Sequence, residues 1–133
     1  MEEVIDLIKE SALSTTAFLE LPTEDELILI EEEILLPIPR DLRTFLLEVS
    51  DLVCGTLEPV TVADIGAHTH LSEVTANAWS LGMPRELMAI CQDNECFYCI
   101  SQDGEIRYWN DGELSEESWE DIWEWAQQIW LSS

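Results

Sequence analysis

The 133-residue sequence contains 29 acidic and 5 basic residues, which give it a formal net charge of -24. Five basic residues cannot build the positive patch that nucleic-acid recognition needs, and an acidic surface repels anionic membranes. Because 47% of the residues are hydrophobic and six are tryptophans, we expect a folded chain with a buried core rather than a disordered one. No repeat or linker pattern interrupts it, which predicts a single domain over residues 1–133.

The strong acidity has two interpretations. An acidic surface attracts a basic protein partner and speeds their encounter, but it can also serve solubility alone. The segment "MEEVIDLIKE" has neither the basic region nor the long apolar run of a secretion signal, so we expect a cytoplasmic protein without a membrane span. Because cytoplasmic thiols stay reduced, the four cysteines do not predict disulfides.

Three helices are predicted in roughly the first 50 residues. Apolar residues in "EEVIDLIKESA" recur at helical spacing. Thr23 and Glu26 have the T-x-x-E spacing of a capping box that would open a second helix, although its "LILI" run also suits a strand. Pro39 suits the first position of a third helix. The apolar faces of the first and third helices contain Val4, Ile5, Ile8 and Ala12, and Leu42, Phe45, Leu46, Val49 and Val53, respectively.

The composition changes after residue 55 and becomes typical of β-strands. "TLEPVTVADI" is rich in β-branched residues and predicts a strand, in which Pro59 favours an edge position. "LSEVTANAWSLGMP" then predicts a short helix that ends near Gly82 and Pro84. Three further strands are predicted from "ELMAIC", "CFYCIS" and "EIRYWN", and Asp103-Gly104 is typical of a two-residue hairpin turn between the last two.

The last segment, "GELSEESWEDIWEWAQQIWLSS", predicts a long helix. Ser115 would be its N-cap, and an apolar stripe follows at helical spacing. Trp125 falls on the flank of this stripe and is expected to be partly exposed. Together the elements predict an α+β fold with N-terminal helices, a mostly antiparallel β-meander and a long C-terminal helix packed on the sheet. The stripe consists of Trp119, Ile122, Trp123, Ala126, Ile129 and Trp130.

Cys96 and Cys99 have the C-x-x-C spacing of many zinc and redox sites. Two-residue turns at positions 93–94 and 103–104 would set the register of the strands that flank them. Because side chains alternate along a strand, Cys96 and Cys99 then point to opposite faces, and Cys91 lies opposite Cys96. We therefore interpret the cysteines as small hydrophobic side chains rather than as metal ligands or a redox pair. The expected cross-strand pairs are Ile100 with Arg107, Cys99 with Tyr108, and Tyr98 with Trp109.

His68 and His70 are two residues apart, a spacing that would suit a metal if they lay on a strand. They precede a predicted helix, however, and the sequence has no third histidine. It also has no nucleophile elbow, phosphate-binding loop, dinucleotide fingerprint or H-E-x-x-H motif. We therefore expect neither catalysis nor a cofactor. Metal binding at the histidines and imitation of DNA phosphates by carboxylates stay open as alternatives.

Three stretches of the sequence share the pattern of one known family. They are "LPIPRDLRTFLLEVSD", "AICQDNECFYCISQDGEIRYWN" and "LSEESWEDIWEWAQQ". The second contains Gly104, Ile106 and Trp109 in a G-x-I-x-x-W arrangement. Over about residues 20–131, the chain resembles the SUKH superfamily, which includes yeast cell-wall-synthesis regulators and bacterial immunity proteins.

The resemblance implies an α+β domain without catalysis. Bacterial members of the superfamily commonly bind and neutralise a toxin, often a nuclease or a deaminase, and an acidic surface suits the basic cleft of such a toxin. A regulatory scaffold protein is the alternative, and a small metal- or thiol-dependent enzyme is a third hypothesis. Acids at the hairpin ends and two tryptophan anchors are the candidate partner contacts. They are Asp93, Glu95, Asp103, Glu105, Asp111 and Glu113, together with Trp109 and Trp125.

Overall fold

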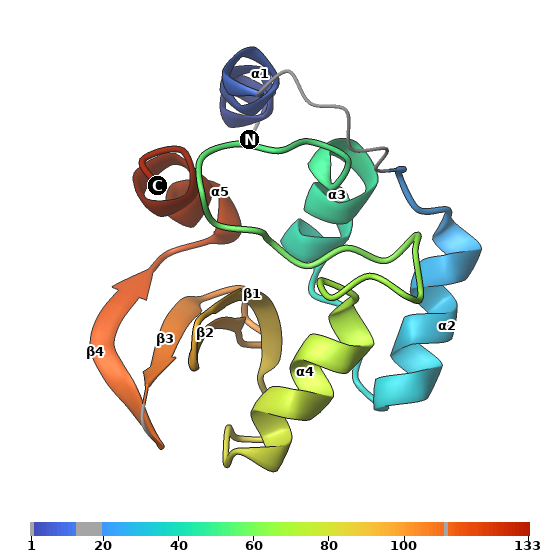
Figure 1. The fold of residues 1–133 in the computed structure, drawn as a ribbon, viewed down its shortest axis with the longest axis vertical. Coiled ribbons are helices and arrows are strands. Elements are labelled where there is room, and N and C mark those ends of the chain that lie inside the picture. The colour runs from blue at the N-terminus through green and yellow to red at the C-terminus, as the bar shows by residue number, and fades with distance from the viewer. Residues whose placement is uncertain (1, 13–19, 111) are drawn as a thin grey trace.

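The computed structural model describes residues 2–12, 20–110 and 112–133. Within these residues, helices form the first half of the chain, and a four-stranded sheet and a short helical segment form the second (Figure 1). The predicted α+β class is therefore confirmed. The elements are α1 (Glu2–Ser11), α2 (Glu24–Ile34), α3 (Arg40–Val49), α4 (Leu71–Ser80), β1 (Met88–Asp93), β2 (Cys96–Ile100), β3 (Ile106–Asn110), β4 (Glu113–Trp119), α5 (Ile122–Trp125) and the π-helical turn η1 (Ala126–Trp130).

Helix α2 begins at the capping box that its sequence predicts. The Thr23 hydroxyl accepts a hydrogen bond from the Glu26 backbone N–H at 3.2 Å, and the Glu26 carboxylate accepts one from the Thr23 backbone N–H at 2.9 Å. Two backbone donors are thereby satisfied at the helix start, and the "LILI" run is helical. Helices α1, α3 and α4 are also confirmed, although Pro39 precedes the first residue of α3 instead of occupying it.

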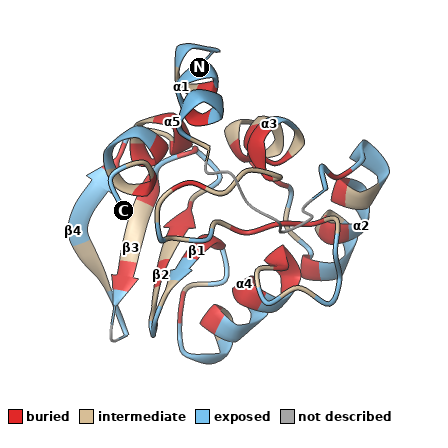
Figure 2. Ribbon diagram, turned by 45° about the horizontal axis from the view of Figure 1, so that its top comes forward, coloured by how far each residue is buried: buried red, intermediate tan, exposed pale blue. Residues whose placement is uncertain are grey.

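The helices are distributed unevenly around the sheet. Helix α4 packs along β1, and α2 packs on the outer side of α4 (Figure 1). Helix α1 contacts α3 and η1, while α3 and α5 contact each other above one face of the sheet. Figure 2 shows that the buried residues of the helices lie on their inward sides. None of the helices in the described ranges is long and apolar enough to cross a membrane.

The sheet is an antiparallel meander in the order β1-β2-β3-β4. Its β2–β3 loop has three residues, 102–104, because the Ser101 backbone N–H bonds to the Glu105 carbonyl oxygen at 3.0 Å. Gly104 has φ +93, which suits the last position of such a loop. The register predicted from a two-residue turn is therefore wrong by one residue. The observed pairs are Phe97 with Trp109, Tyr98 with Tyr108, Cys99 with Arg107, and Ile100 with Ile106.

The β1–β2 turn is also displaced by one residue from its predicted position. Asp93 pairs with Cys96, so the turn occupies residues 94 and 95. Asn94 has φ +56, a left-handed conformation that asparagine tolerates better than most residues. A bulge precedes Cys91, which pairs with Tyr98. The expected pairing of Cys91 with Cys96 is therefore wrong.

The long C-terminal helix predicted from the last segment is wrong. Residues Glu113–Trp119 form strand β4 along β3, and only residues 122–130 are helical. Asp121, not Ser115, caps this segment, because its carboxylate accepts a hydrogen bond from the Glu124 backbone N–H at 2.8 Å. The free edge of β3 offers backbone partners to residues 113–119, with Asn110 paired to Glu113, and this pairing between consecutive strands leaves no trace in helical periodicity.

The strand predicted from "TLEPVTVADI" is replaced by an irregular segment at the sheet edge. Isolated bridges connect Pro59 to Cys91 and Thr61 to His70. The Val60 backbone N–H donates to the Ile90 carbonyl oxygen at 2.8 Å. Because Pro59 has no N–H to donate, it cannot continue a regular ladder. The prediction of a strand is wrong here, but the edge position of Pro59 is confirmed.

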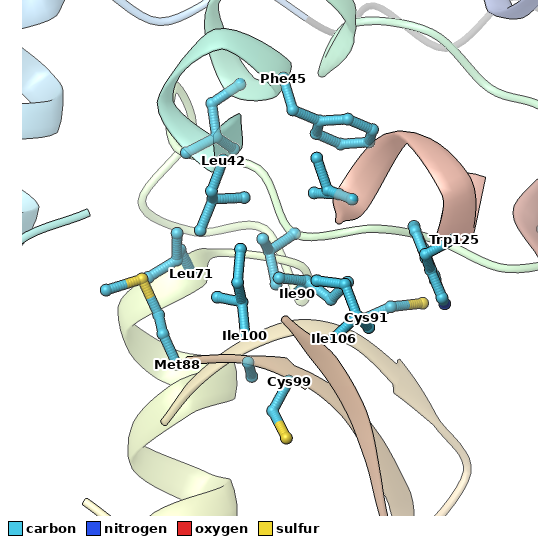
Figure 3. Close-up of a cluster of buried hydrophobic side chains, with 14 of the residues drawn as sticks. Leu42, Phe45, Leu71, Met88, Ile90, Cys91, Cys99, Ile100, Ile106 and Trp125 are labelled. Atoms are coloured by element: carbon cyan, nitrogen blue, oxygen red, sulfur yellow. The ribbon is translucent and has the colours of Figure 1, made fainter. Parts of the chain in front are cut away.

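The buried core lies between the sheet and helices α3 and α5. Figure 3 shows Leu42 and Phe45 of α3 above Ile100, with Trp125 beside them. The Phe45 ring centroid lies 6.0 Å from that of Trp123, and both rings are tilted relative to each other. Since the sheet supplies β-branched side chains and the helices supply aromatic ones, the two layers interdigitate.

Candidate protein-interaction surface

The acids predicted to contact a partner lie at two opposite ends of the sheet. Asp93 and Glu95 flank the β1–β2 turn, and Glu113 begins β4 at the same end. Asp103 and Glu105 lie at the β2–β3 loop, at the other end. Alternate turns of an antiparallel meander are separated by a strand length, which is roughly 17 Å for five residues. The predicted acids therefore do not form one continuous surface.

The two tryptophans predicted as aromatic anchors are buried. Trp109 is 3% exposed and Trp125 is 0% exposed. The partial exposure expected for Trp125 is wrong, because that expectation assumed a continuous helix from Ser115. The Trp125 ring instead packs 5.4 Å from the Tyr98 ring, measured between centroids. Neither tryptophan presents surface to a partner in this conformation, and the predicted contact Asp111 lies outside the described residues.

One face of the sheet changes character along its length. Near the β2–β3 loop, Ile100 and Ile106 are buried in the core below α3 (Figure 3). Two residues further along each strand, the same face carries Tyr98 and Tyr108, which are only half-buried. The face therefore continues beyond its helical cover, and its open part is aromatic.

The two tyrosines rest on a buried aromatic layer. The ring centroids of Tyr98 and Tyr108 are 4.7 Å apart. Tyr98 also packs against Trp119 at 5.6 Å and Trp125 at 5.4 Å. The Tyr108 hydroxyl donates a hydrogen bond to the Asp93 carboxylate at 3.5 Å. Because tilted aromatic pairs stabilise by about 1 kcal/mol each, these contacts hold the pair in position before any partner arrives.

Negative charge lies beside the two phenol groups. Burial raises the pKa of Tyr98 to about 12, and the charges of Asp93 and Glu117 contribute to this rise. Burial also raises the pKa of Tyr108, and its hydrogen bond with Cys96 and the charge of Asp93 act in the same direction. Both phenols are therefore neutral at pH 7. We define the acidic–aromatic surface as Asp93, Cys96, Tyr98, Tyr108 and Glu117.

The basic side chains with assigned contacts do not neutralise the acidic–aromatic surface. Arg43 forms its ion pairs with two acids of α2. Arg107 lies on the opposite face of the sheet from Tyr98 and donates to the Ser115 carbonyl oxygen at 2.8 Å. In the described part of the chain, no ion pair involves Asp93 or Glu117. Unpaired carboxylates beside aromatic rings can bind a cationic side chain, since both groups attract positive charge.

The geometry of the cysteines suits packing rather than chemistry. Cys96 and Cys99 lie on opposite faces of β2, as predicted, and Figure 3 shows the Cys99 thiol on the side of the sheet away from Ile100. Burial raises the pKa of Cys91 and of Cys99 to about 12. Both thiols therefore stay protonated at neutral pH, which makes them poor metal ligands and poor nucleophiles.

The two histidines lie in different surroundings. His70 is buried at the start of α4, whereas His68 is exposed and its Nε2 lies 2.6 Å from a carboxylate oxygen of Glu58. Across residues 2–12, 20–110 and 112–133, no group of three histidine, cysteine or acidic side chains could hold a metal ion. The structure thus gives no support to a shared metal at His68 and His70.

Tyr98 and Tyr108 were not among the contacts predicted from the sequence. A two-residue turn would place them on different faces of the sheet, whereas the three-residue loop pairs them directly. Asp103-Gly104 was the available clue, because a glycine also ends three-residue hairpin loops. The observed register pairs Tyr98 with Tyr108, whose hydroxyl bonds to Asp93.

Comparison with known proteins assigns the fold to a family. A family model described as SMI1-KNR4 cell-wall, SUKH_5, matches residues 1–131. The chain belongs to this family. The match confirms the SUKH resemblance that the three sequence stretches suggested. Membership of the SUKH family fits a non-catalytic immunity or regulatory protein and, in general, a role in protein–protein interaction.

A solved structure supports the same fold for the SUKH chain. A crystal structure of a protein from Pseudomonas syringae pv. tomato matches it with a TM-score of 0.96 and 50% sequence identity. The match covers 100% of both chains. No curated protein matched the sequence.

Proposed function

We propose that this SUKH protein is a non-catalytic immunity-type protein that binds and neutralises a basic toxin domain of the nuclease or deaminase class. The observation that carries the proposal is the acidic–aromatic surface. There, Tyr98 and Tyr108 are packed against each other beside carboxylates without ion-pair partners in the described residues. The net charge of -24 extends the same negative field over the whole molecule.

The chemistry of a nucleic-acid-processing toxin complements this surface. Such an enzyme must hold a polyanion, and it does so with lysine and arginine side chains. The carboxylates of Asp93 and Glu117 can pair with those cations and thereby exclude the phosphates of the substrate. Tyrosine rings strengthen the contact through cation–π attraction and are frequent anchors in protein interfaces. The mechanism requires only binding, and none of the SUKH protein's own residues takes part in a reaction.

Co-expression provides the direct test of the function. We expect that a toxin domain encoded beside this gene stops host growth when expressed alone and does not do so when the SUKH protein is present. Binding of the purified pair should weaken as salt concentration rises, because salt screens exposed charges. Equal killing by every neighbouring candidate, with and without the SUKH protein, would overturn the proposal.

Two matched variants test which end of the sheet binds. Asp93→Asn and Asp103→Asn each remove one negative charge from a sheet turn, at opposite ends. We expect Asp93→Asn to raise the Kd for the toxin about tenfold, which corresponds to about 1.4 kcal/mol, and Asp103→Asn to change it less than about twofold. Calorimetry at fixed salt measures both values. Equal effects would show that total charge, and not the acidic–aromatic surface, determines binding.

The alternative is a regulatory scaffold, which the cell-wall description of the family favours. A pull-down that returns signalling or wall-synthesis proteins and no toxin would support this alternative. A thiol-dependent enzyme has less support, because burial keeps Cys91 and Cys99 protonated.

A further inference from the structure

An apolar cavity lies between α3, the segment 52–69 and η1, and its volume is about 110 Å³. Its wall includes Phe45 and Val49 of α3, Val60, and Trp130 of η1, each at most 1% exposed. The ring centroids of Phe45 and Trp130 are 5.5 Å apart. The chain's own side chains leave this space empty, and the wall therefore lacks contacts that an occupant could supply.

The polar side chains in the wall are already hydrogen-bonded. The Ser50 hydroxyl donates to the Leu46 carbonyl oxygen at 2.6 Å. The hydroxyls of Thr61 and Thr69 bond to each other at 2.8 Å, and the Trp130 indole N–H donates to a backbone carbonyl at 3.1 Å. A buried water molecule needs two to four polar partners, whereas these groups already bond within the chain and most of the wall is apolar. The wall therefore favours an apolar occupant over water.

The size of the cavity limits that occupant to a single small group. Apolar cavities of about 150 Å³ stay dry and bind benzene. A cavity of about 110 Å³ therefore suits an apolar group no larger than a leucine or phenylalanine side chain.

The polar rim of the cavity indicates what lies next to the apolar group. Glu58 and His68 line the cavity and are otherwise exposed. The Glu58 carboxylate oxygen lies 2.6 Å from His68 Nε2, so a cation adjacent to the apolar group would take the place of His68 as its partner at the rim. The arrangement of an apolar pocket inside a polar rim is typical of an interface anchor.

The rim adjoins the acidic–aromatic surface. Pro59 forms a bridge to Cys91, and Cys91 pairs with Tyr98. Glu58 directly precedes Pro59, and Asp93 follows Cys91 by two residues on β1, so the two carboxylates belong to adjacent stretches of backbone. A partner seated on Tyr98 could therefore reach the cavity without leaving this side of the molecule.

We infer that the cavity is an anchor pocket for an apolar side chain of the basic partner, with a neighbouring cationic side chain of that partner paired to Glu58. This inference rests on the proposed function, because it names the contact that the neutralised toxin makes. The pocket itself can be tested on the isolated SUKH protein, separately from the toxin.

Toluene and benzylamine probe the pocket, since both carry a phenyl ring and only benzylamine carries a cation. We expect saturable changes in the ¹³C-methyl resonances of Val49 and Val60 with either probe. Benzylamine should bind at least threefold more tightly than toluene, and Glu58→Gln should remove that difference. Absence of saturable changes with both probes would overturn the inference.

A cavity-filling variant locates the probe. Ala67 lines the cavity and lies in the irregular segment before α4, so Ala67→Leu should fill the space and weaken probe binding at least tenfold. Ala76→Leu adds the same atoms on the exposed side of α4 and should bind the probes as the native protein does. Val53→Phe replaces Ala67→Leu if the latter fails to fold. Unchanged probe binding in a folded, filled variant would contradict the inference.

The same variants test the anchor pocket separately from the proposed neutralisation of a toxin. If the toxin is neutralised, Ala67→Leu should raise its Kd at least tenfold relative to Ala76→Leu. If the Kd of the toxin is the same for Ala67→Leu and Ala76→Leu, the anchor assignment is wrong, while the proposed function stands. Probe binding without any neutralised toxin would instead overturn the proposed function, and the anchor assignment with it.

Discussion

Ile100 and Tyr98 are two residues apart on the same face of β2, yet their surroundings differ. Ile100 is 0% exposed and lies in the core below α3, and its partner Ile106 is equally buried. Tyr98 and its partner Tyr108 are half-buried at the margin of the same face, next to Asp93. We refer to these as the covered half and the open half of the sheet face.

The comparison shows that the extent of the helical cover determines what a strand residue does. Both halves use large side chains, but α3 and α5 seal only the covered half, and α5 reaches the edge of the open half where Trp125 packs on Tyr98. The open half exposes aromatic rings, which are enriched in interfaces, beside carboxylates, which a buried core rarely contains. We therefore expect substitutions in the covered half to change stability and substitutions in the open half to change binding.

Trp125→Ala should have the largest effect, because it removes the aromatic layer at the boundary of the two halves. Trp125 is 0% exposed and packs against Tyr98. We expect the free energy of unfolding to fall by about 3–5 kcal/mol. Urea denaturation measures the change, with Leu29→Ala on the exposed side of α2 as a control expected to stay within about 0.5 kcal/mol. A loss below about 1 kcal/mol would show that Trp125 does not support the aromatic layer between the two halves.

Alkaline pH should destabilise the protein through groups that are buried on this face. The pKa of Cys91 is raised by burial from 9.0 to about 12, so above pH 9 the folded state keeps a proton that the unfolded state loses. The free energy of unfolding should therefore decrease between pH 9 and 12 by up to about 1.4 kcal/mol per pH unit for this thiol. Cys91→Ala should reduce the slope measured by urea unfolding at several pH values. An identical slope in Cys91→Ala would show that other groups cause it.

Tyr108→Phe should have the smallest effect on stability, because it alters only the open half. It removes a hydroxyl whose hydrogen bond to Asp93 is long, at 3.5 Å. We expect thermal and urea unfolding to change by less than about 0.5 kcal/mol. A loss above about 2 kcal/mol would mean that the open half belongs to the core and not to an interface.

Elements specified by neighbouring residues were predictable. The capping box of Thr23 and Glu26 and the apolar spacing of α1, α3 and α4 depend on contacts within one turn of helix. Strand β4 was not predictable in this way, since residues 113–119 become a strand by pairing with β3. Helical spacing across Trp119 and Trp123 was present in the sequence, but it did not decide the backbone conformation.

The candidate site was predictable only in its acidity. Asp93 was identified from its place in a hairpin turn, whereas Tyr98 and Tyr108 were missed because a one-residue error in register moved them to different faces. Trp109 and Trp125 were expected as anchors because tryptophan is frequent in interfaces. Their burial depends on which elements cover them, and residue type does not report that.

The sequence by itself determined the SUKH family, the α+β class, the acidic surface and the helices of the first half, because each is written in composition or short-range spacing. Only the tertiary structure decided the strand register, the existence of β4 and the cavity beside Trp130. The register and β4 depend on pairing between consecutive strands, and the cavity depends on segments that meet from distant parts of the chain, so none of the three follows from the spacing within one segment. Cys96 and Cys99 illustrate this difference. The sequence predicted that their side chains point to opposite faces of the strand, but it did not predict which residues they pair with on the neighbouring strands.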